Sequence, residues 1–176
     1  HQEICFVGNL RLPWYARCHA GYERAMNEAG IEARVCSVES MDEQETGYLA
    51  TKTVLARETK ISAIFAGTDP TARGVYKAAR DLRLKIPQDL SVVSCNNTYG
   101  AWLHPPLTSI REYPEQLGKR MVELALSRIA QPDRPAQQIT VPTELIKRES
   151  CLPFGGSDGD AGASVQVAAS SEAAAL

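Results

Sequence analysis

Short apolar runs alternate with segments of helical periodicity over the first hundred residues, and this alternation restricts the possible folds more than any other feature of the chain. Four runs have the length and composition of buried strands; they span residues 3–8, 33–38, 61–66 and 90–95. A helical segment or a turn follows each run. Such an alternation predicts an α/β fold, in which a parallel sheet with right-handed crossovers carries helices on both faces.

Start and stop signals delimit the expected helices. Pro13 fits the first turn of a helix that ends at Gly30, and a second helix is expected over residues 41–57. Asp69 and Pro70 directly follow the third strand. The Asp69 carboxylate is expected to cap a third helix by accepting hydrogen bonds from its first turn, because aspartate is a favoured N-cap residue.

The order of elements changes after residues 104–106 (HPP). A short extended piece is expected at 107–110, a helix at 114–129, and two short strands at 139–142 and 144–147. From Gly155 onward the composition shifts to Gly, Ser and Ala. That composition buries little apolar surface and predicts a flexible or loosely helical tail.

Charge and hydropathy exclude several functional classes. The net charge of −2 provides no broad basic surface, so this chain alone is expected to bind DNA poorly. No apolar run is long enough to span a bilayer, which argues against a membrane protein. No signal peptide opens the chain, and this favours a cytoplasmic location.

The residue types that carry catalysis or bind metals form no known motif. The five cysteines contain no C-x-x-C pair, so neither a zinc site nor a thioredoxin-like motif is predicted. Cys5, Cys36 and Cys95 lie within strand-like runs and are expected to be small buried hydrophobes. The three histidines fit no triad or metal arrangement, and no phosphate-binding loop is present. We therefore predict no enzymatic activity, no cofactor and no metal site.

Three stretches, in this order and spacing, resemble the lactose/galactose/purine repressor (LacI/GalR) family of bacterial transcription regulators. Residues 63–98 contain a P-x-D-L-S-V-V strand, residues 105–111 a Pro-Leu-Thr crossover, and residues 145–150 a terminal strand after a P-T-E turn. The Gly21-Tyr22 pair is also similar to the family's R-x-x-G-F helix. The resemblance extends over about residues 1–150.

This resemblance implies a truncated two-lobed fold of the periplasmic-binding-protein-like I type, which holds a small effector between its lobes. Residues 1–104 would form the C-terminal effector-binding lobe. Residues 105–150 would return to the N-terminal lobe and cross back, and residues 151–176 would form the flexible tail. No helix-turn-helix is visible, so operator DNA would be bound through a headpiece absent from this chain. A homodimer is also implied, with residues 71–83 and 99–104 as candidate contacts.

Ligands of open α/β sheets bind where the strands end, and there the family pattern and the residue chemistry mark seven effector-binding candidates. These are Asn9, Trp14, Arg17, Cys18, Thr68, Asn96 and Glu112. Cys18 stands where the resemblance implies an arginine. Arg17, one residue earlier, either reaches the cleft by a local adjustment or is a solvated charge. Glu112 either faces the cleft or is solvated.

Asn96 stands where the resemblance implies an acidic effector contact. It either faces the cleft or forms a turn with Asn97. The groups expected at the strand ends are the neutral donors and acceptors Asn9, Thr68, Asn96 and Asn97, and they favour a small uncharged, hydroxyl-rich effector such as a sugar. Trp14 and Trp102 are expected to flank the mouth of this site, where each tryptophan either packs an aromatic face on a sugar or serves in the core or an interface.

The leading interpretation is an effector-binding and dimerisation fragment of a ligand-responsive, repressor-like transcription regulator. Two alternatives remain open from the sequence alone. One is a sugar-binding protein of a transport system, which uses a similar fold. The other is a sensing or interaction module that binds no small ligand.

Overall fold

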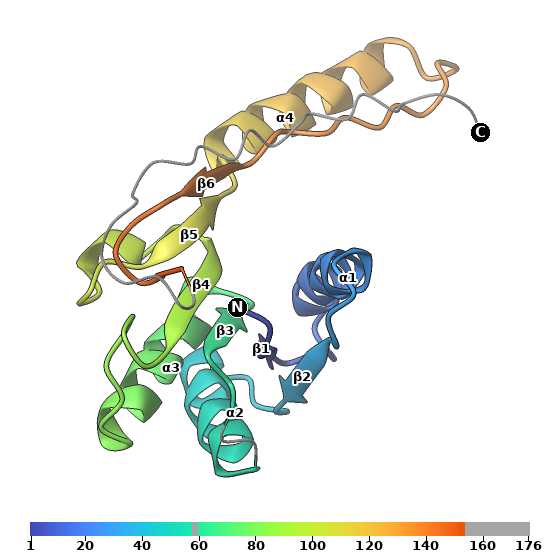
Figure 1. Cartoon of the computed structure of the whole chain (residues 1–176). Helices are drawn as coiled ribbons and strands as arrows, with labels where there is room; N and C mark the ends of the chain where they lie inside the picture. Colours follow the sequence, from blue (N-terminus) through green and yellow to red (C-terminus); the bar gives the residue numbers. More distant parts are fainter. Residues whose placement is uncertain (58–59, 154–176) are drawn as a thin grey trace.

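The computed structural model describes residues 1–57 and 60–153, which form a six-stranded sheet with helices on both faces and one projecting helix (Figure 1). The strands are β1 (Ile4–Gly8), β2 (Arg34–Ser37), β3 (Ala63–Ala66), β4 (Ser91–Asn96), β5 (Thr108–Arg111) and β6 (Glu144–Ile146). The helices are α1 (Pro13–Glu28), α2 (Glu43–Arg57), α3 (Asp69–Asp81), the short 3-10 helix η1 (Gly100–Trp102) and α4 (Pro114–Ala130). The predicted α/β architecture is confirmed.

The strands lie in the order β2-β1-β3-β4-β5-β6. Strands β1 to β5 all pair in parallel, whereas β6 runs antiparallel to β5, with Ser109 opposite Ile146. Parallel neighbours need a crossover connection, which α1, α2 and α3 supply for the first four strands. The carboxyl ends of the five parallel strands therefore lie along one edge of the sheet.

Side chains of β1 alternate between two apolar clusters, as the period of a strand requires. Cys5 and Val7 lie in the larger cluster, which includes buried residues of α2 and α3. Phe6 lies in the smaller cluster with Tyr15 and Tyr22 of α1. The sheet is thus covered by α1 on one face and by the α2–α3 pair on the other.

Two glycines let α2 and α3 approach each other closely. A Cβ atom added to Gly47 would lie 2.0 Å from the carbonyl oxygen of Thr71, and one added to Gly74 would lie 2.1 Å from that of Gln44. These are backbone atoms that cannot rotate away. Only glycine permits this contact between the two helices.

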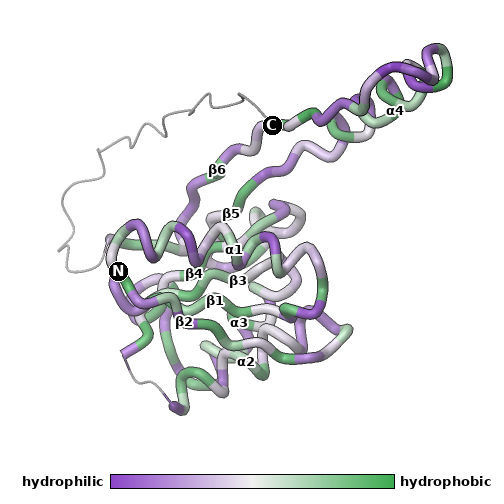
Figure 2. Tube along the Cα trace, turned by 90° about the vertical axis from the view of Figure 1, so that its right-hand side faces the viewer, coloured by the Kyte–Doolittle hydropathy of each residue, from purple (hydrophilic) through white to green (hydrophobic). Residues whose placement is uncertain are grey.

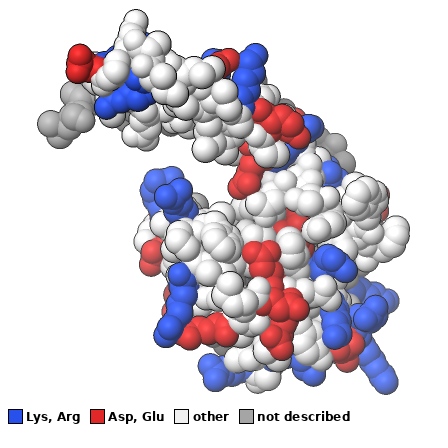
Figure 3. All heavy atoms as spheres, turned by 180° about the vertical axis from the view of Figure 1, so that it is seen from behind, with Lys and Arg blue, Asp and Glu red and all other residues white. Residues whose placement is uncertain are grey.

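Helix α4 projects from the body and buries none of its side chains (Figures 1 and 2). Its exposed apolar residues include Leu117, Met121, Val122, Leu126 and Ile129. Figure 3 shows a broad uncharged stretch along this projecting part, while charged side chains of both signs cover much of the body. Over residues 1–57 and 60–153, no helix combines the length and apolar character needed to cross a membrane.

Three expectations about local structure need correction. Residues 139–142 form no strand, because no neighbouring strand pairs with them. Asp69 is not the cap of α3. Thr68 is the cap: its backbone is extended, and its side-chain oxygen accepts the N–H of Thr71. Cys5 and Cys95 are buried as expected, but Cys36 is only half-buried at the β2 edge. The tail expected at 151–176 lies outside the described residues from position 154 onward.

Candidate functional site

A hollow of about 350 Å³ lies at the edge of the sheet where β3, β4 and β5 end and α1 begins. The residues that line it are Pro13, Trp14, Arg17, Cys18, Gly67, Thr68, Asn96 and Glu112. Six of the seven effector contacts predicted from the sequence are among them. The structure brings these six together because they follow strand ends or start the helix above that edge.

Thr68 contributes a buried hydroxyl to this hollow. It follows β3 and caps α3, so its side chain is fixed by the start of a helix. Its hydroxyl donates to the carboxylate of Glu43 at 3.1 Å and accepts the backbone N–H of Thr71 at 3.3 Å. The Thr68 oxygen is therefore oriented before any ligand arrives.

Tyr15 supports the floor of the hollow and was not predicted from the sequence. Its ring lies against Gly8, the last residue of β1, and Gly67, which follows β3: a Cβ at either glycine would lie within 2.4 Å of the ring. Its hydroxyl is 2.5 Å from the side-chain oxygen of Thr71 and 3.3 Å from that of Thr68. Burial raises the pKa of Tyr15, so the hydroxyl stays neutral. The sequence does contain a signal for this contact. A glycine stands at the end of each of the two strand-like runs, and an aromatic residue stands in the first turn of the helix that follows the first run.

Asn96 and Glu112 form one wall. The side-chain amide of Asn96 donates to the carboxylate of Glu112 at 3.0 Å, linking the end of β4 to the end of β5. Asn96 has a φ of 91° and Asn97 a φ of 51°, a left-handed region that asparagine tolerates better than most residues. The turn and the cleft-facing interpretations of Asn96 are thus compatible, because this residue ends a strand in a turn and also lines the hollow.

Cys18 and Arg17 form the opposite wall, on α1. The Cys18 sulfur lies 3.7 Å from the sulfur of Cys95. The pKa of the Cys18 thiol is lowered by hydrogen bonding with Cys95, which outweighs the opposing effects of burial and of the Glu112 carboxylate. Arg17 is exposed and lines the hollow. One cationic and one anionic side chain therefore line the hollow.

Three residues expected near this site lie elsewhere. Asn9 is buried and does not line the hollow; its amide donates to the carbonyl of Ser40 at 3.0 Å and accepts the N–H of Arg11 at 3.1 Å. Asn97 accepts a hydrogen bond from Arg148 at 2.7 Å. The expectation that Trp102 flanks the same mouth as Trp14 is wrong, because η1 carries Trp102 to a different hollow.

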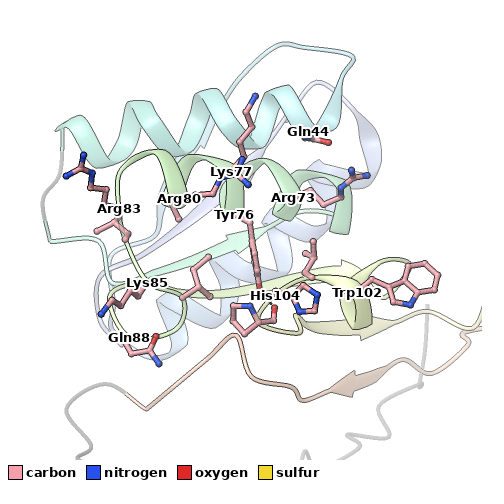
Figure 4. A pocket seen from close by; sticks show the side chains of 15 residues that line it. Gln44, Arg73, Tyr76, Lys77, Arg80, Arg83, Lys85, Gln88, Trp102 and His104 are labelled. Carbon is pink, nitrogen blue, oxygen red and sulfur yellow. Dashed lines mark hydrogen bonds between the residues drawn. The ribbon is translucent and has the colours of Figure 1, made fainter.

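That second hollow is larger, about 780 Å³, and lies between α3 and the segment that contains η1 (Figure 4). The cationic residues around it are Arg73, Lys77, Arg80, Arg83 and Lys85. Tyr76 extends from α3 and donates to the carbonyl of Pro105 at 3.0 Å. This is the surface on which the sequence predicts dimer contacts, and none of the seven effector candidates lines it.

Neither hollow has the composition of a metal site. Among residues 1–57 and 60–153 there is no group of three or more His, Cys, Asp or Glu side chains that could hold a metal ion. The first hollow instead offers a hydroxyl, an amide, a carboxylate, a guanidinium and an indole face. Such a set can bind a small polar ligand by directed hydrogen bonds and by stacking.

Comparison with known proteins agrees with the α/β fold. A family model described as periplasmic binding protein-like domain matches residues 1–151. The HTH-type transcriptional repressor PurR of Erwinia tasmaniensis is 37% identical over 153 residues, which are 85% of this chain and 45% of that repressor. The chain thus spans less than half of this relative's length.

Solved structures give the same result for the fold. A LacI family transcriptional regulator from Enterococcus faecium with bound ribose superposes with a TM-score of 0.77 and 26% identity, over 88% of this chain and 58% of that one. A LacI family transcriptional regulator from Enterococcus faecalis V583, also with bound ribose, superposes with a TM-score of 0.76 and 27% identity, over 88% and 56% of the two chains.

Proposed function

Because this chain belongs to the family of periplasmic-binding-protein-like domains, in the form that LacI/GalR regulators carry, we propose that it is the effector-binding part of a ligand-responsive transcription repressor. The single observation that carries this proposal is the hollow of about 350 Å³ at the strand ends, whose lining comes from four separate segments and includes six of the seven effector candidates. Relatives that are repressors support the regulatory role. As part of a DNA-acting regulator, the chain would work in the cytoplasm and would have no enzymatic activity.

The effector would act by binding one arrangement of the protein better than another. The hollow is bounded by the body on one side and by Glu112 on the other, directly before the projecting helix α4. A ligand that contacts both Thr68 and Glu112 would therefore favour one position of α4 relative to the body. A ligand shifts such an equilibrium only by its difference in affinity for the two states.

The effector that suits this hollow is a small uncharged molecule rich in hydroxyl groups, such as a monosaccharide. Thr68, Asn96 and Glu112 offer donors and acceptors that match hydroxyl groups. Trp14 is half-exposed and offers a flat apolar face. Among the residues that the structure describes, Arg17 is the single cation that lines the hollow, whereas a phosphorylated ligand favours an Arg fork or a nest of N–H groups. The two ribose-bound relatives support the same class of ligand.

Calorimetry on the full-length protein tests the ligand class. Ribose and other monosaccharides, sugar phosphates and purines are titrated into the wild type, into Asn96→Gly and into the control Asn27→Gly. Glycine tolerates the positive φ of position 96, so the backbone is preserved while the amide is removed. We expect a monosaccharide to bind, and Asn96→Gly to weaken it about tenfold, the effect of one lost hydrogen bond. Binding of only a phosphorylated ligand or a purine would contradict this assignment.

The partners of the whole protein follow from the same proposal. We expect a homodimer whose contact includes α3 and η1, since closed two-fold dimers are the commonest oligomers. Operator DNA would be bound by a helix-turn-helix outside this chain. Sedimentation over a range of concentrations and a gel shift with operator DNA test both points. A monomer at all concentrations, or sequence-specific DNA binding by this chain alone, would count against them.

A further inference from the structure

Two cysteines that are far apart in the sequence lie next to each other at the wall of the first hollow, the one at the strand ends where we propose that the effector binds (the effector hollow). Cys18 is on α1 and Cys95 is on β4, yet their sulfur atoms are 3.7 Å apart. Cys18 lines the hollow, so a small molecule that enters the hollow can reach its sulfur. Cys95 is 4% exposed and lies behind it. The pair therefore combines one accessible thiol with one protected thiol.

The charges around this pair affect the two sulfurs differently. Hydrogen bonding with Cys95 lowers the pKa of Cys18, while the hydrogen bond with Cys18 and burial raise the pKa of Cys95. The carboxylates of Glu112 and Asp69 oppose ionisation of Cys95, and Glu112 also opposes that of Cys18. Cys18 is thus the thiol that ionises first, and thiolates are the reactive form of cysteine.

Cys151 gives a useful contrast. Its sulfur donates to the carbonyl oxygen of Val92 at 3.1 Å, and burial raises the pKa of its thiol. Cys151 lines neither the hollow at the strand ends nor the second hollow, which lies between α3 and η1. Cys151 should therefore resist oxidation, and it serves as the control cysteine.

We propose that Cys18 and Cys95 are a redox-modification site, which a peroxide converts to a reversible disulfide at the wall of the effector hollow. The Cys18 thiolate attacks one peroxide oxygen and breaks the O–O bond, giving the Cys18 sulfenic acid and a hydroxide that takes up a proton. The Cys95 sulfur then attacks the Cys18 sulfur, the S–S bond forms, and water leaves. Overall two thiols are oxidised by two electrons and one hydrogen peroxide is reduced to two waters. A dithiol reductant reverses the change by exchange.

The disulfide would alter the site. A disulfide requires the sulfurs to close from 3.7 Å to about 2 Å, which draws the first turns of α1 toward β4. Trp14 and Arg17 lie on those same turns and line the hollow. Oxidation would therefore change effector affinity; this consequence, unlike the disulfide itself, rests on the proposed function.

The first experiment tests the disulfide without any effector. The chain is treated with hydrogen peroxide, its remaining thiols are alkylated, and peptides are mapped by mass spectrometry. We expect two of the five thiols to be lost, a single linked peptide pair that joins Cys18 to Cys95, and full recovery with dithiothreitol. The control Cys151→Ser should behave as the wild type. A wild-type chain that links other cysteines, or whose Cys18 is oxidised irreversibly without a link, would overturn the proposal.

Two variants separate the roles of the two thiols. In Cys95→Ala, peroxide should leave Cys18 as a sulfenic acid that dimedone traps. In Cys18→Ala, Cys95 should stay reduced, because it is protected and its thiol is the less acidic. Circular dichroism establishes that each variant is folded. Equal peroxide sensitivity of Cys95 with and without Cys18 would contradict the assigned order.

A second experiment tests the effect on the ligand. Ribose is titrated into full-length protein before and after oxidation, with Cys151→Ser treated in parallel. We expect at least a severalfold change in affinity that dithiothreitol restores. A disulfide that forms without a change in ribose affinity would refute the coupling. Absence of ribose binding to the reduced protein would count against the assignment of the ligand and not against the disulfide.

Discussion

Helices α3 and α4 both carry apolar side chains at helical spacing, yet they differ in what those side chains contact. α3 buries Ala72, Val75 and Ala79 against the sheet and α2. α4 buries none of its side chains, and Val122 is 59% exposed. Apolar periodicity thus predicts that a helix forms and which side is apolar, but the rest of the protein determines whether that side is covered.

This contrast predicts where the stability of the chain resides. Side chains of α3 should contribute strongly to the free energy of unfolding, while those of α4 should contribute little in this chain. Four substitutions, ordered from the largest expected effect to the smallest, test where the stability resides: three lie on α3, and the last lies on α1 as a further comparison.

Asp69→Ala should have the largest effect. The carboxylate of Asp69 is fully buried and accepts hydrogen bonds from the hydroxyls of Ser94 and Ser109 and from the N–H groups of Tyr99 and Gly100. Its removal leaves buried donors without partners, and we expect a loss of about 4 kcal/mol in urea unfolding. The exposed Asp81→Ala at the other end of α3 is the control and should lose less than about 1 kcal/mol. Equal losses would refute this explanation.

The glycines of the two helices provide the next comparison. A Cβ at Gly74 of α3 would lie 2.1 Å from the backbone of α2, whereas a Cβ at Gly118 of α4 would have no atom of the described residues within 4 Å apart from the backbone of its own helix. Gly74→Ala should therefore destabilise the chain by about 3 kcal/mol, and Gly118→Ala should raise helix stability by up to about 1 kcal/mol. Thermal unfolding followed by circular dichroism measures both. A stabilising Gly74→Ala would show that α2 and α3 are less closely packed than described.

The same substitution, valine to alanine, should have different effects on the two helices. Val75 of α3 is fully buried, and Val122 of α4 is 59% exposed. Val75→Ala should cost about 2 kcal/mol through lost burial and the cavity it leaves, and Val122→Ala less than about 0.5 kcal/mol. Urea unfolding at low protein concentration compares them. A large loss for Val122→Ala would mean that a second copy or another segment covers α4.

Helix α1 covers the opposite face of the sheet, and Tyr22 tests how firmly it is held. The Tyr22 hydroxyl donates to the carbonyl of Ile4 at 2.9 Å and accepts the N–H of Arg34 at 3.1 Å. Tyr22→Phe should cost about 1 kcal/mol near neutral pH.

The same residue predicts a dependence on pH. Burial raises the pKa of Tyr22 from 10.0 to about 12, so only the unfolded chain loses this proton between those values. The contribution of Tyr22 is therefore complete below pH 10 and is lost as the pH rises toward 12. The difference in unfolding free energy between the wild type and Tyr22→Phe should decrease over that range. A difference that grows with pH would contradict the described environment of Tyr22.

The sequence predicted β1 to β4 and α1 to α3 because periodicity, glycine stops and proline starts are local signals. It did not predict the role of Asp69, whose partners on β4, β5 and η1 are 25 to 40 residues away. An N-cap is a local interpretation of an aspartate before proline. Tertiary contacts instead hold the Asp69 carboxylate inside the body of the protein.

The candidate site was predictable where a rule of topology applied. Thr68, Asn96 and Glu112 follow strand ends, and parallel strands bring such positions to one edge. Asn9 also follows a strand, but its amide bonds to the backbone of the next connection, which no local pattern reveals. The proximity of Cys18 to Cys95 could not be predicted either, because it depends on how α1 lies across the sheet.

The backbone at the end of β4 also limits how this hollow can diversify over evolutionary time. With a φ of 91°, position 96 admits glycine, asparagine and aspartate far more readily than β-branched or bulky residues. Few substitutions at position 96 are therefore compatible with the fold. Trp14 and Cys18 stand on regular helix, where most side chains are tolerated. Lineages that acquire new ligands should do so mainly by exchanges on the α1 side, while the β4 side stays nearly constant.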